Sequence, residues 1–226
     1  MGMLHYHEAI AEGGIKGLQA QQRDWSPFVA HFTCSAAMKQ LWRSLPKPLD
    51  SAAVKTGLAQ ADQKSFQSFQ AIINNGTLRA SKPPPTSDAD PRVCLSECTL
   101  PGLISHAERF GRFGLVFGKT ELFGYGGRPC VYVSSNTYGK LATQRGTSTE
   151  MMELFNLANV LSPPGFGKIQ DFTHEREWRV MRDIDLIALR PVAYVVPSVD
   201  YLGRLPGGCA PTTPVVPLTL LHRWGV

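Results

Sequence analysis

The chain has 226 residues, of which 43% are hydrophobic and 18% are charged. It can therefore fill a sizeable core, and disorder is not expected. A net charge of +5 and a pI near 9.0 give a mild basic bias, which is compatible with a phosphate-bearing partner.

The sequence shows no pattern typical of a secretory signal or of a membrane-spanning segment. The amino-terminal segment lacks the basic start and apolar stretch of a secretory signal, and no apolar run reaches the length that spans a bilayer. We therefore expect a cytoplasmic protein with no membrane partner. The five cysteines are an odd set, and the close pair Cys94 and Cys98 has no second pair to complete a zinc site. Reduced thiols and no metal are expected.

The first part of the chain predicts an arm, a strand and a helix. Residues 1–24 have no clean hydrophobic period and are interpreted as an arm or accessory helix before a single domain over 25–226. The apolar and β-branched run 28–33 is typical of a strand. Ser35 is placed to cap a helix that ends before Pro46.

The remaining chain predicts a strand-rich domain. A helix over 59–73 ends at Asn75-Gly76, and the four prolines of 81–91 indicate a surface loop. Further helices are predicted over 103–110 and 151–161, strands over 93–96, 114–117, 129–133, 177–181, 186–189, 193–196 and 215–220, and a hairpin turn at 124–127. The sum is an α+β fold with helices mainly in the N-terminal half.

A carboxylate pair stands in the polar run 171–179. If the segment is extended, Glu175 and Glu177 point to the same face of a sheet, about 7 Å apart along the strand. Such a pair can divide labour: one carboxylate orients a ribose hydroxyl and stabilises an oxocarbenium-like charge, while the other accepts a proton from a nucleophile. The alternative is a solvated strand face balanced by neighbouring arginines.

His31 and Thr33 are two residues apart, so they share one face of the predicted first strand. Together the imidazole and the hydroxyl could grip a ribose or an amide, although a histidine in an apolar run is also explained as a satisfied core residue. Ser96, at the end of a predicted strand, is a binding group or a turn residue.

Aromatic and basic residues interleave after residue 108. Phe110 or Phe113 could stack on a planar ring such as nicotinamide or a nucleobase, with Arg109 or Arg112 near a pyrophosphate. Core packing explains Phe113 equally well.

Taken in order, six segments resemble the AbiGi-type abortive-infection proteins and, more distantly, the DarT-like ADP-ribosyltransferases of bacterial toxin and phage-defence systems. The resemblance covers about residues 28–202. The segments are His31-Phe-Thr, Phe69-Gln-Ala-Ile-Ile-Asn-Asn-Gly-Thr-Leu, Val93-Cys-Leu-Ser-Glu, Phe110-Gly-Arg-Phe-Gly-Leu-Val-Phe-Gly-Lys, Pro129-Cys-Val-Tyr and His174-Glu-Arg-Glu-Trp-Arg.

The resemblance implies an ADP-ribosyltransferase-like split β-sandwich that grips NAD⁺ between two small sheets. In that family a polar residue of the first strand holds NAD⁺, which here implies His31 with Thr33. A serine on a middle strand supports the site, as Ser96 would. A glutamate on a late strand binds the nicotinamide ribose, which is the position of Glu177, and Glu175 would complete a Glu-x-Glu arrangement.

The sequence therefore predicts NAD⁺-dependent transfer of ADP-ribose to a macromolecule, with DNA or RNA favoured over protein because of the positive charge and the DarT-like similarity. The resemblance also implies a cognate toxin or antitoxin partner. The alternative is a non-enzymatic antitoxin or sensing module of a defence system, because the AbiGi group includes antitoxin-like members. A nuclease is disfavoured, since no cluster of acids and histidines has metal-ligand spacing.

Overall fold

The computed structural model describes residues 26–33, 40–41, 51–82, 90–144, 152, 154–159, 170–171, 173–209 and 212–223. The predicted arm over 1–24 lies outside these residues. So does most of the predicted helix after Ser35, of which Gln40 and Leu41 are described and helical. Within the described ranges, no helix is both long and apolar enough to cross a membrane.

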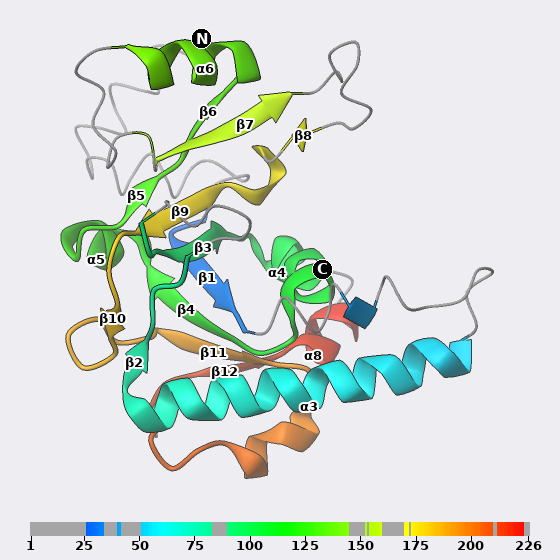
Figure 1. Ribbon diagram of the computed structural model, residues 1–226. Helices are drawn as coiled ribbons and strands as arrows, with labels where there is room; N and C mark the ends of the chain where they lie inside the picture. Colours follow the sequence, from blue (N-terminus) through cyan, green and yellow to red (C-terminus); the bar gives the residue numbers. More distant parts are fainter. Residues whose placement is uncertain are drawn as a thin grey trace, which may run out of the picture.

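A seven-stranded sheet runs through the described structure (Figure 1). Neighbouring strands are antiparallel except β11 and β12, which are parallel. The sheet and its helices confirm the predicted α+β class. In spatial order the strands are β12 (Val215–Pro217), β11 (Ala193–Val196), β4 (Gly114–Gly118), β1 (Phe28–Phe32), β3 (Val93–Glu97), β9 (Glu177–Val180) and β5 (Arg128–Pro129).

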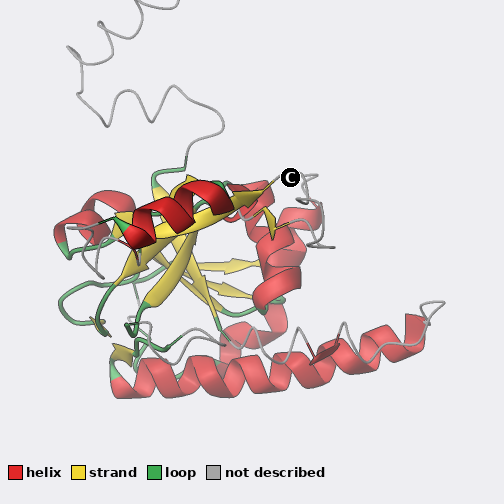
Figure 2. Cartoon of the chain, turned by 45° about the horizontal axis from the view of Figure 1, so that its top comes forward, coloured by secondary structure: helices red, strands yellow, loops and turns green. Residues whose placement is uncertain are grey.

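The long helix α3 (Ser51–Asn75) covers one face of this sheet, which we call the α3 face (Figures 1 and 2). Phe66 and Phe69 of the helix enter one hydrophobic cluster with alternate residues of the strands, because successive strand side chains point to opposite faces. The strand residues of this cluster are Val29, Val93, Leu95, Leu115, Phe117, Trp178, Val180, Tyr194 and Val196. α3 begins earlier than predicted and ends, as predicted, before Gly76, whose φ is +64°.

Two shorter helices, α4 (Leu100–Phe110) and α8 (Leu218–Arg223), pack on the opposite face, which we call the α4 face. This second cluster takes the intervening strand residues. Its members include Ala30, Phe32, Val116 and Val195 from the strands and Leu103, Ala107, Leu218 and Leu221 from the helices. β4 is buried at all five positions because it lies in the middle of the sheet, between both layers.

Thr99 and Gly111 set the ends of α4. The Thr99 hydroxyl accepts a bond from the Gly102 N–H at 3.3 Å, which satisfies a donor of the first turn. Gly111 donates to the Ala107 carbonyl with a φ of +128°, so the helix ends at Phe110, as predicted.

A second, three-stranded sheet lies on the side of the large sheet away from α3, at the top of Figure 1. It is formed by β6 (Val131–Val133), β7 (Phe155–Asn159) and β8 (Gln170–Asp171), and helix α6 (Ser135–Thr143) connects to it. The remaining described elements are β2 (Thr77–Leu78), which pairs with β10 (Ile184–Asp185), helix α5 (Lys119–Gly124) and the 3₁₀ turns η1 (Thr173–Glu175) and η2 (Val199–Arg204).

Several predicted elements are wrong. The described part of 151–161 is mainly β7, a strand that pairs with β6, and the run 186–189 is a turn. The stretch 124–127 is not a hairpin turn, since helix α5 precedes it and β4 and β5 pair with other strands. The predicted strand over 129–133 divides at Cys130 between the two sheets, and 218–220 belongs to α8 rather than to a strand.

Candidate functional site

Ser96 and Glu177 lie directly opposite each other on the neighbouring strands β3 and β9. Opposite residues of an antiparallel pair share a face. Leu95 and Trp178, the next residues in register, belong to the α3 face. Ser96 and Glu177 therefore lie on the α4 face, and the structure brings this predicted pair together.

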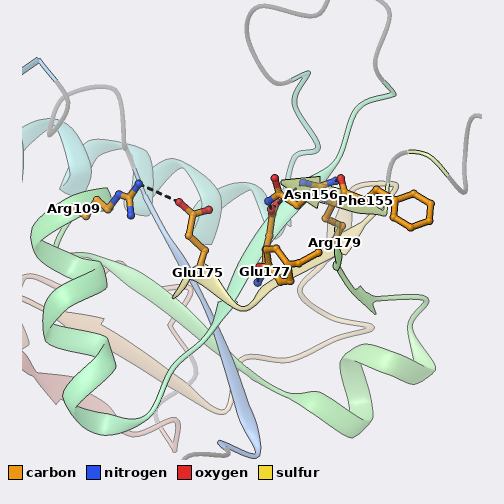
Figure 3. Close-up of polar contacts among 7 residues, drawn as sticks. Arg109, Phe155, Asn156, Glu175, Glu177 and Arg179 are labelled. Carbon is orange, nitrogen blue, oxygen red and sulfur yellow. Dashed lines mark hydrogen bonds and ion pairs between the residues drawn. The ribbon is translucent and has the colours of Figure 1, made fainter. Parts of the chain in front are cut away.

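Glu177 is buried in a network of charged and amide groups (Figure 3). Its carboxylate accepts bonds from Arg179 Nε at 2.9 Å, Arg179 Nη2 at 2.9 Å and Asn156 Nδ2 at 2.7 Å. Arg179 also donates to the Phe155 carbonyl at 3.1 Å. β9 therefore supplies both members of an ion pair, and β7 of the small sheet closes over it.

Tyr132 ties the small sheet to the same position. Its hydroxyl accepts the Glu177 backbone N–H at 2.7 Å. Burial raises the pKa of Tyr132 above its usual range, so the phenol stays neutral and keeps a proton to donate. The Glu177 segment is thus held by two residues of the small sheet, Tyr132 of β6 and Asn156 of β7.

The electrostatics of Glu177 favour the ionised form. Burial acts to raise its pKa, but the hydrogen bonds and the positive charge of Arg179 outweigh burial and leave the pKa below its usual value. Such a carboxylate is a weak base near neutral pH. It suits electrostatic stabilisation of a positive charge better than proton abstraction.

Glu175 does not share this environment, because the segment is not extended at Glu175 and the condition for a same-face pair is not met. Glu175 ends the turn η1, and Arg176 follows with a φ of +41°, a left-handed conformation that breaks the alternation before β9. Glu175 forms an ion pair at 3.2 Å with Arg109, at the carboxyl end of α4. Figure 3 shows this pair beside the Glu177 network, with separate partners.

His31 lies on β1, the neighbour of β3, but on the other face of the sheet. Ala30 is opposite Ser96 and belongs to the α4 face, so His31, opposite Leu115, belongs to the α3 face. Its Nδ1 lies 2.9 Å from the Cys94 carbonyl oxygen. Burial lowers its pKa although this hydrogen bond acts to raise it, so His31 is neutral near pH 7.

Thr33 is buried, and its hydroxyl lies within hydrogen-bond distance of the Ser65 carbonyl at 3.0 Å and the Phe113 carbonyl at 3.2 Å. Ser65 donates in return to the Thr33 carbonyl at 3.3 Å. These bonds fasten β1 to α3. The structure does not bring His31 and Thr33 to the face that carries Ser96 and Glu177.

The aromatic candidates divide in the same way. Phe113 is fully enclosed among Phe66, Phe69 and Tyr201 on the α3 face, where it packs the core. Phe110 is half-buried at the end of α4, and the guanidinium of Arg109 lies 5.2 Å from its ring centre. Arg112 is paired with Asp62 of α3. Of this set, Arg109 and Phe110 lie nearest the Glu175 turn.

A second ion pair joins the buried Lys119 to the partly buried Glu97 at 2.9 Å, with Lys119 Nζ lying 5.5 Å from the centre of the Trp178 ring. Glu97 also lies 3.8 Å from Arg176. Sequence reasoning missed this pair and also Asn156 and Tyr132, while Arg179 entered it only as one of the arginines that balance a solvated strand face. Arg179 had a readable signal, because it stands two residues after Glu177 on one strand. Asn156 had none, since its segment was predicted to be a helix.

Metal ligation is not visible in this region. Among the described residues, no three or more His, Cys, Asp or Glu side chains are grouped so as to hold a metal ion.

The fold and site together define a mixed α+β protein with a buried glutamate–arginine pair beneath a second small sheet. Comparison of the chain with protein-family models, curated proteins and solved structures found no significant match.

Proposed function

We propose that this protein is an NAD⁺-dependent ADP-ribosyltransferase acting on a macromolecule in a toxin–antitoxin or phage-defence setting. One observation carries the proposal: the strands bearing His31, Ser96 and Glu177 are consecutive neighbours, β1, β3 and β9, and Ser96 lies opposite Glu177. The resemblance to AbiGi-type and DarT-like proteins implies an NAD⁺ site built on the same three strands. The net charge of +5 favours DNA or RNA over protein as acceptor.

The proposed fold is the split pair of sheets that the resemblance implies. The β6–β7–β8 sheet is the second sheet of that pair in this proposal, and two of its residues, Tyr132 and Asn156, contact the Glu177 residue. Ser96 supports the nicotinamide ribose from β3. Arg109 and Phe110, at the end of α4, lie at the rim near the turn that carries Glu175.

The proposed reaction breaks the bond between the ribose and the nicotinamide nitrogen. Nicotinamide leaves with the electron pair of that bond and becomes neutral, and the ionised Glu177 stabilises the ribosyl cation. A nitrogen or oxygen of the acceptor then forms the new bond to the same carbon. The acceptor's proton passes to Glu175 or to water. His31 and Thr33 act as positioning residues, because they hold β1 to Cys94 and to α3 rather than facing Glu177.

One observation favours the rival, a non-enzymatic antitoxin or sensing module. The Glu177 carboxylate already accepts three N–H bonds, two of them from Arg179. A carboxylate has about four acceptor positions, so one or none remains for a ribose hydroxyl. In this alternative function, the Glu177–Arg179 pair only stabilises the fold, and the exposed surface of the protein binds its partner.

Incubation with NAD⁺ radiolabelled in the adenylate part separates the two functions. We expect label on a macromolecule of a cell extract, removed by nuclease treatment if the acceptor is nucleic acid and by protease if it is protein. Free nicotinamide should appear in step. Glu177→Gln should lose at least roughly a hundredfold in rate, because the charge that stabilises the cation is gone.

Glu175→Gln is the matched variant, since it removes the same charge two residues away in a partly exposed pair. It should slow transfer to the acceptor more than nicotinamide release. Thermal melting of both variants shows whether they fold. Wild-type protein that yields neither labelled macromolecule nor nicotinamide would overturn the transferase and leave the binding module. Equal loss in both steps for Glu175→Gln would remove its assigned role.

A further inference from the structure

A hollow of about 270 Å³ lies beside the β5–β9 end of the large sheet, next to α5 at the left of Figure 1. We call it the arginine pocket. Three of its lining residues are arginines, and no carboxylate is among the described residues that line it. The lining residues are Tyr125, Gly126, Arg128, Leu154, Arg179, Val180, Met181 and Arg182. Gly126 and Arg182 are exposed, so the pocket reaches the surface.

Two of the guanidinium groups are fixed in place by aromatic rings and carbonyls. Arg128 stacks on the Phe123 ring at 4.0 Å and donates from Nη1 to the Phe123 and Gly127 carbonyls, at 2.9 and 2.8 Å. Arg182 stacks on the Tyr125 ring at 4.3 Å and donates from Nη2 to the Tyr125 carbonyl at 2.6 Å. Each group keeps further N–H donors, because a guanidinium has five.

The ring of Tyr125 is itself held. Its hydroxyl donates to the Asp183 carbonyl at 3.2 Å and accepts the Asp185 N–H at 3.0 Å. The Tyr125 ring, on which Arg182 stacks, is therefore anchored through its hydroxyl to the segment of β10, while its backbone belongs to the loop between α5 and β5. Two cations set in advance lose little conformational entropy when they bind an anion.

Charge balance in the pocket is incomplete. Arg128 and Arg179 lie directly opposite each other on β5 and β9, and like charges in that position destabilise a sheet. Glu177 offsets the charge of Arg179. Within the described part of the chain, Arg128 and Arg182 form no ion pair with a carboxylate. An anion in the pocket would supply the missing negative charge.

We propose that the arginine pocket binds a phosphate group carried by a nucleotide or a nucleic acid strand. Planar arginine forks match phosphate oxygens with paired hydrogen bonds. The volume is a little below the roughly 300 Å³ at which small-molecule sites begin, so it fits a phosphate and part of the group bonded to it. This site goes beyond the transferase proposal and does not require it, since Arg128 and Arg182, the two arginines on which the pocket proposal rests, are assigned no part in that reaction.

The test measures binding of three probes: inorganic phosphate, adenosine 5′-monophosphate and a short fluorescein-labelled single-stranded DNA. Arg128→Gln/Arg182→Gln should weaken saturable binding of the phosphate-bearing probes roughly tenfold or more, the loss expected for charge-assisted hydrogen bonds. Arg190→Gln, an exposed arginine outside the pocket lining, is the control and should change affinity less than roughly twofold.

The probes distinguish the two sources of phosphate. Tight DNA binding that falls steeply with salt and is little displaced by the mononucleotide assigns the site to a strand. If adenosine 5′-monophosphate displaces the labelled DNA as well as unlabelled DNA does, the site is assigned to a nucleotide. Absence of saturable binding to all three probes, or an equal loss in Arg190→Gln, would overturn the proposal. Nicotinamide release is measured on the same proteins. If the wild type has no transferase activity but Arg128→Gln/Arg182→Gln still loses phosphate binding, the pocket proposal is supported and the transferase proposal is not.

Discussion

The Glu177–Arg179 pair shows how two adjacent same-face residues of a strand serve one another. Both side chains are less than a tenth exposed, and both carboxylate oxygens are bonded to the guanidinium. Buried pairs of this kind add little compared with apolar residues, but loss of one partner leaves an uncompensated charge.

Arg179→Met is therefore expected to lower the free energy of unfolding by about 3–5 kcal/mol, because Glu177 would stay buried without the positive charge and the hydrogen bonds that compensate its burial. Urea denaturation measures the loss. The double variant Glu177→Gln/Arg179→Met removes both charges and should regain most of it. A single variant as stable as the wild type would show that water already reaches the pair.

His31 predicts a pH dependence. Burial lowers its pKa from the ordinary 6.5, so below about pH 6.5 the unfolded chain takes up a proton that the folded protein does not yet bind. Stability is fully present above that pH and declines as the pH falls toward the lowered value. His31→Gln should remove this component, which reaches at most about 1.4 kcal/mol per pH unit. Urea midpoints of both proteins from pH 8 to 5 measure it, and parallel curves would contradict it.

At the scale of elements, local signals found the segments whose own residues specify them. Asn75-Gly76 ends α3, Gly111 ends α4, and the apolar runs of β1, β3, β4 and β11 are strands. α6 was missed because it has no buried residue and so no apolar stripe. Its remaining signal is Ser134, whose hydroxyl accepts the Thr137 N–H at 3.2 Å as an N-cap.

Residues 151–161 were predicted as a helix because their apolar residues have helical spacing, yet β7 gains its hydrogen bonds from β6. Strand formation depends on a partner strand, which local spacing does not reveal. Residues 186–189 form a turn because Asp185 accepts two hydrogen bonds. Its side chain accepts the Ile187 N–H and its backbone carbonyl accepts the Leu189 N–H.

Two glycines, Gly111 at the end of α4 and Gly139 within α6, form a matched pair for substitution by alanine. A Cβ on Gly111 would lie 2.0 Å from the Thr33 carbonyl oxygen at a φ of +128°, so Gly111→Ala should cost about 2–3 kcal/mol of stability. Gly139, within α6, has nothing within 4 Å of such a Cβ, and Gly139→Ala should stabilise by about 0.5–1 kcal/mol. Thermal and urea unfolding measure both. Similar effects of the two substitutions would show that α4 does not end as described.

For the whole molecule, burial is uneven, and we expect this in amide hydrogen exchange. Peptides from β4, buried at every residue, should exchange only through global unfolding. Peptides from α6, which buries none, should exchange through local opening and respond little to stabilising substitutions in the core. Mass spectrometry resolves the two regions. Equal protection of α6 and β4 would mean that another surface covers α6.

The linear chain was enough to place the main strands and two longest helices and to single out Ser96 and Glu177, because alternation, capping residues and polar groups in apolar runs are local properties. Folding settled which sheet face each polar residue occupies and which partner it meets. His31 lies across the sheet from Glu177, Glu175 turns to Arg109, and Arg128 comes to lie opposite Arg179. Those outcomes depend on strand pairing between distant segments and on one left-handed residue, Arg176, which no local pattern encodes.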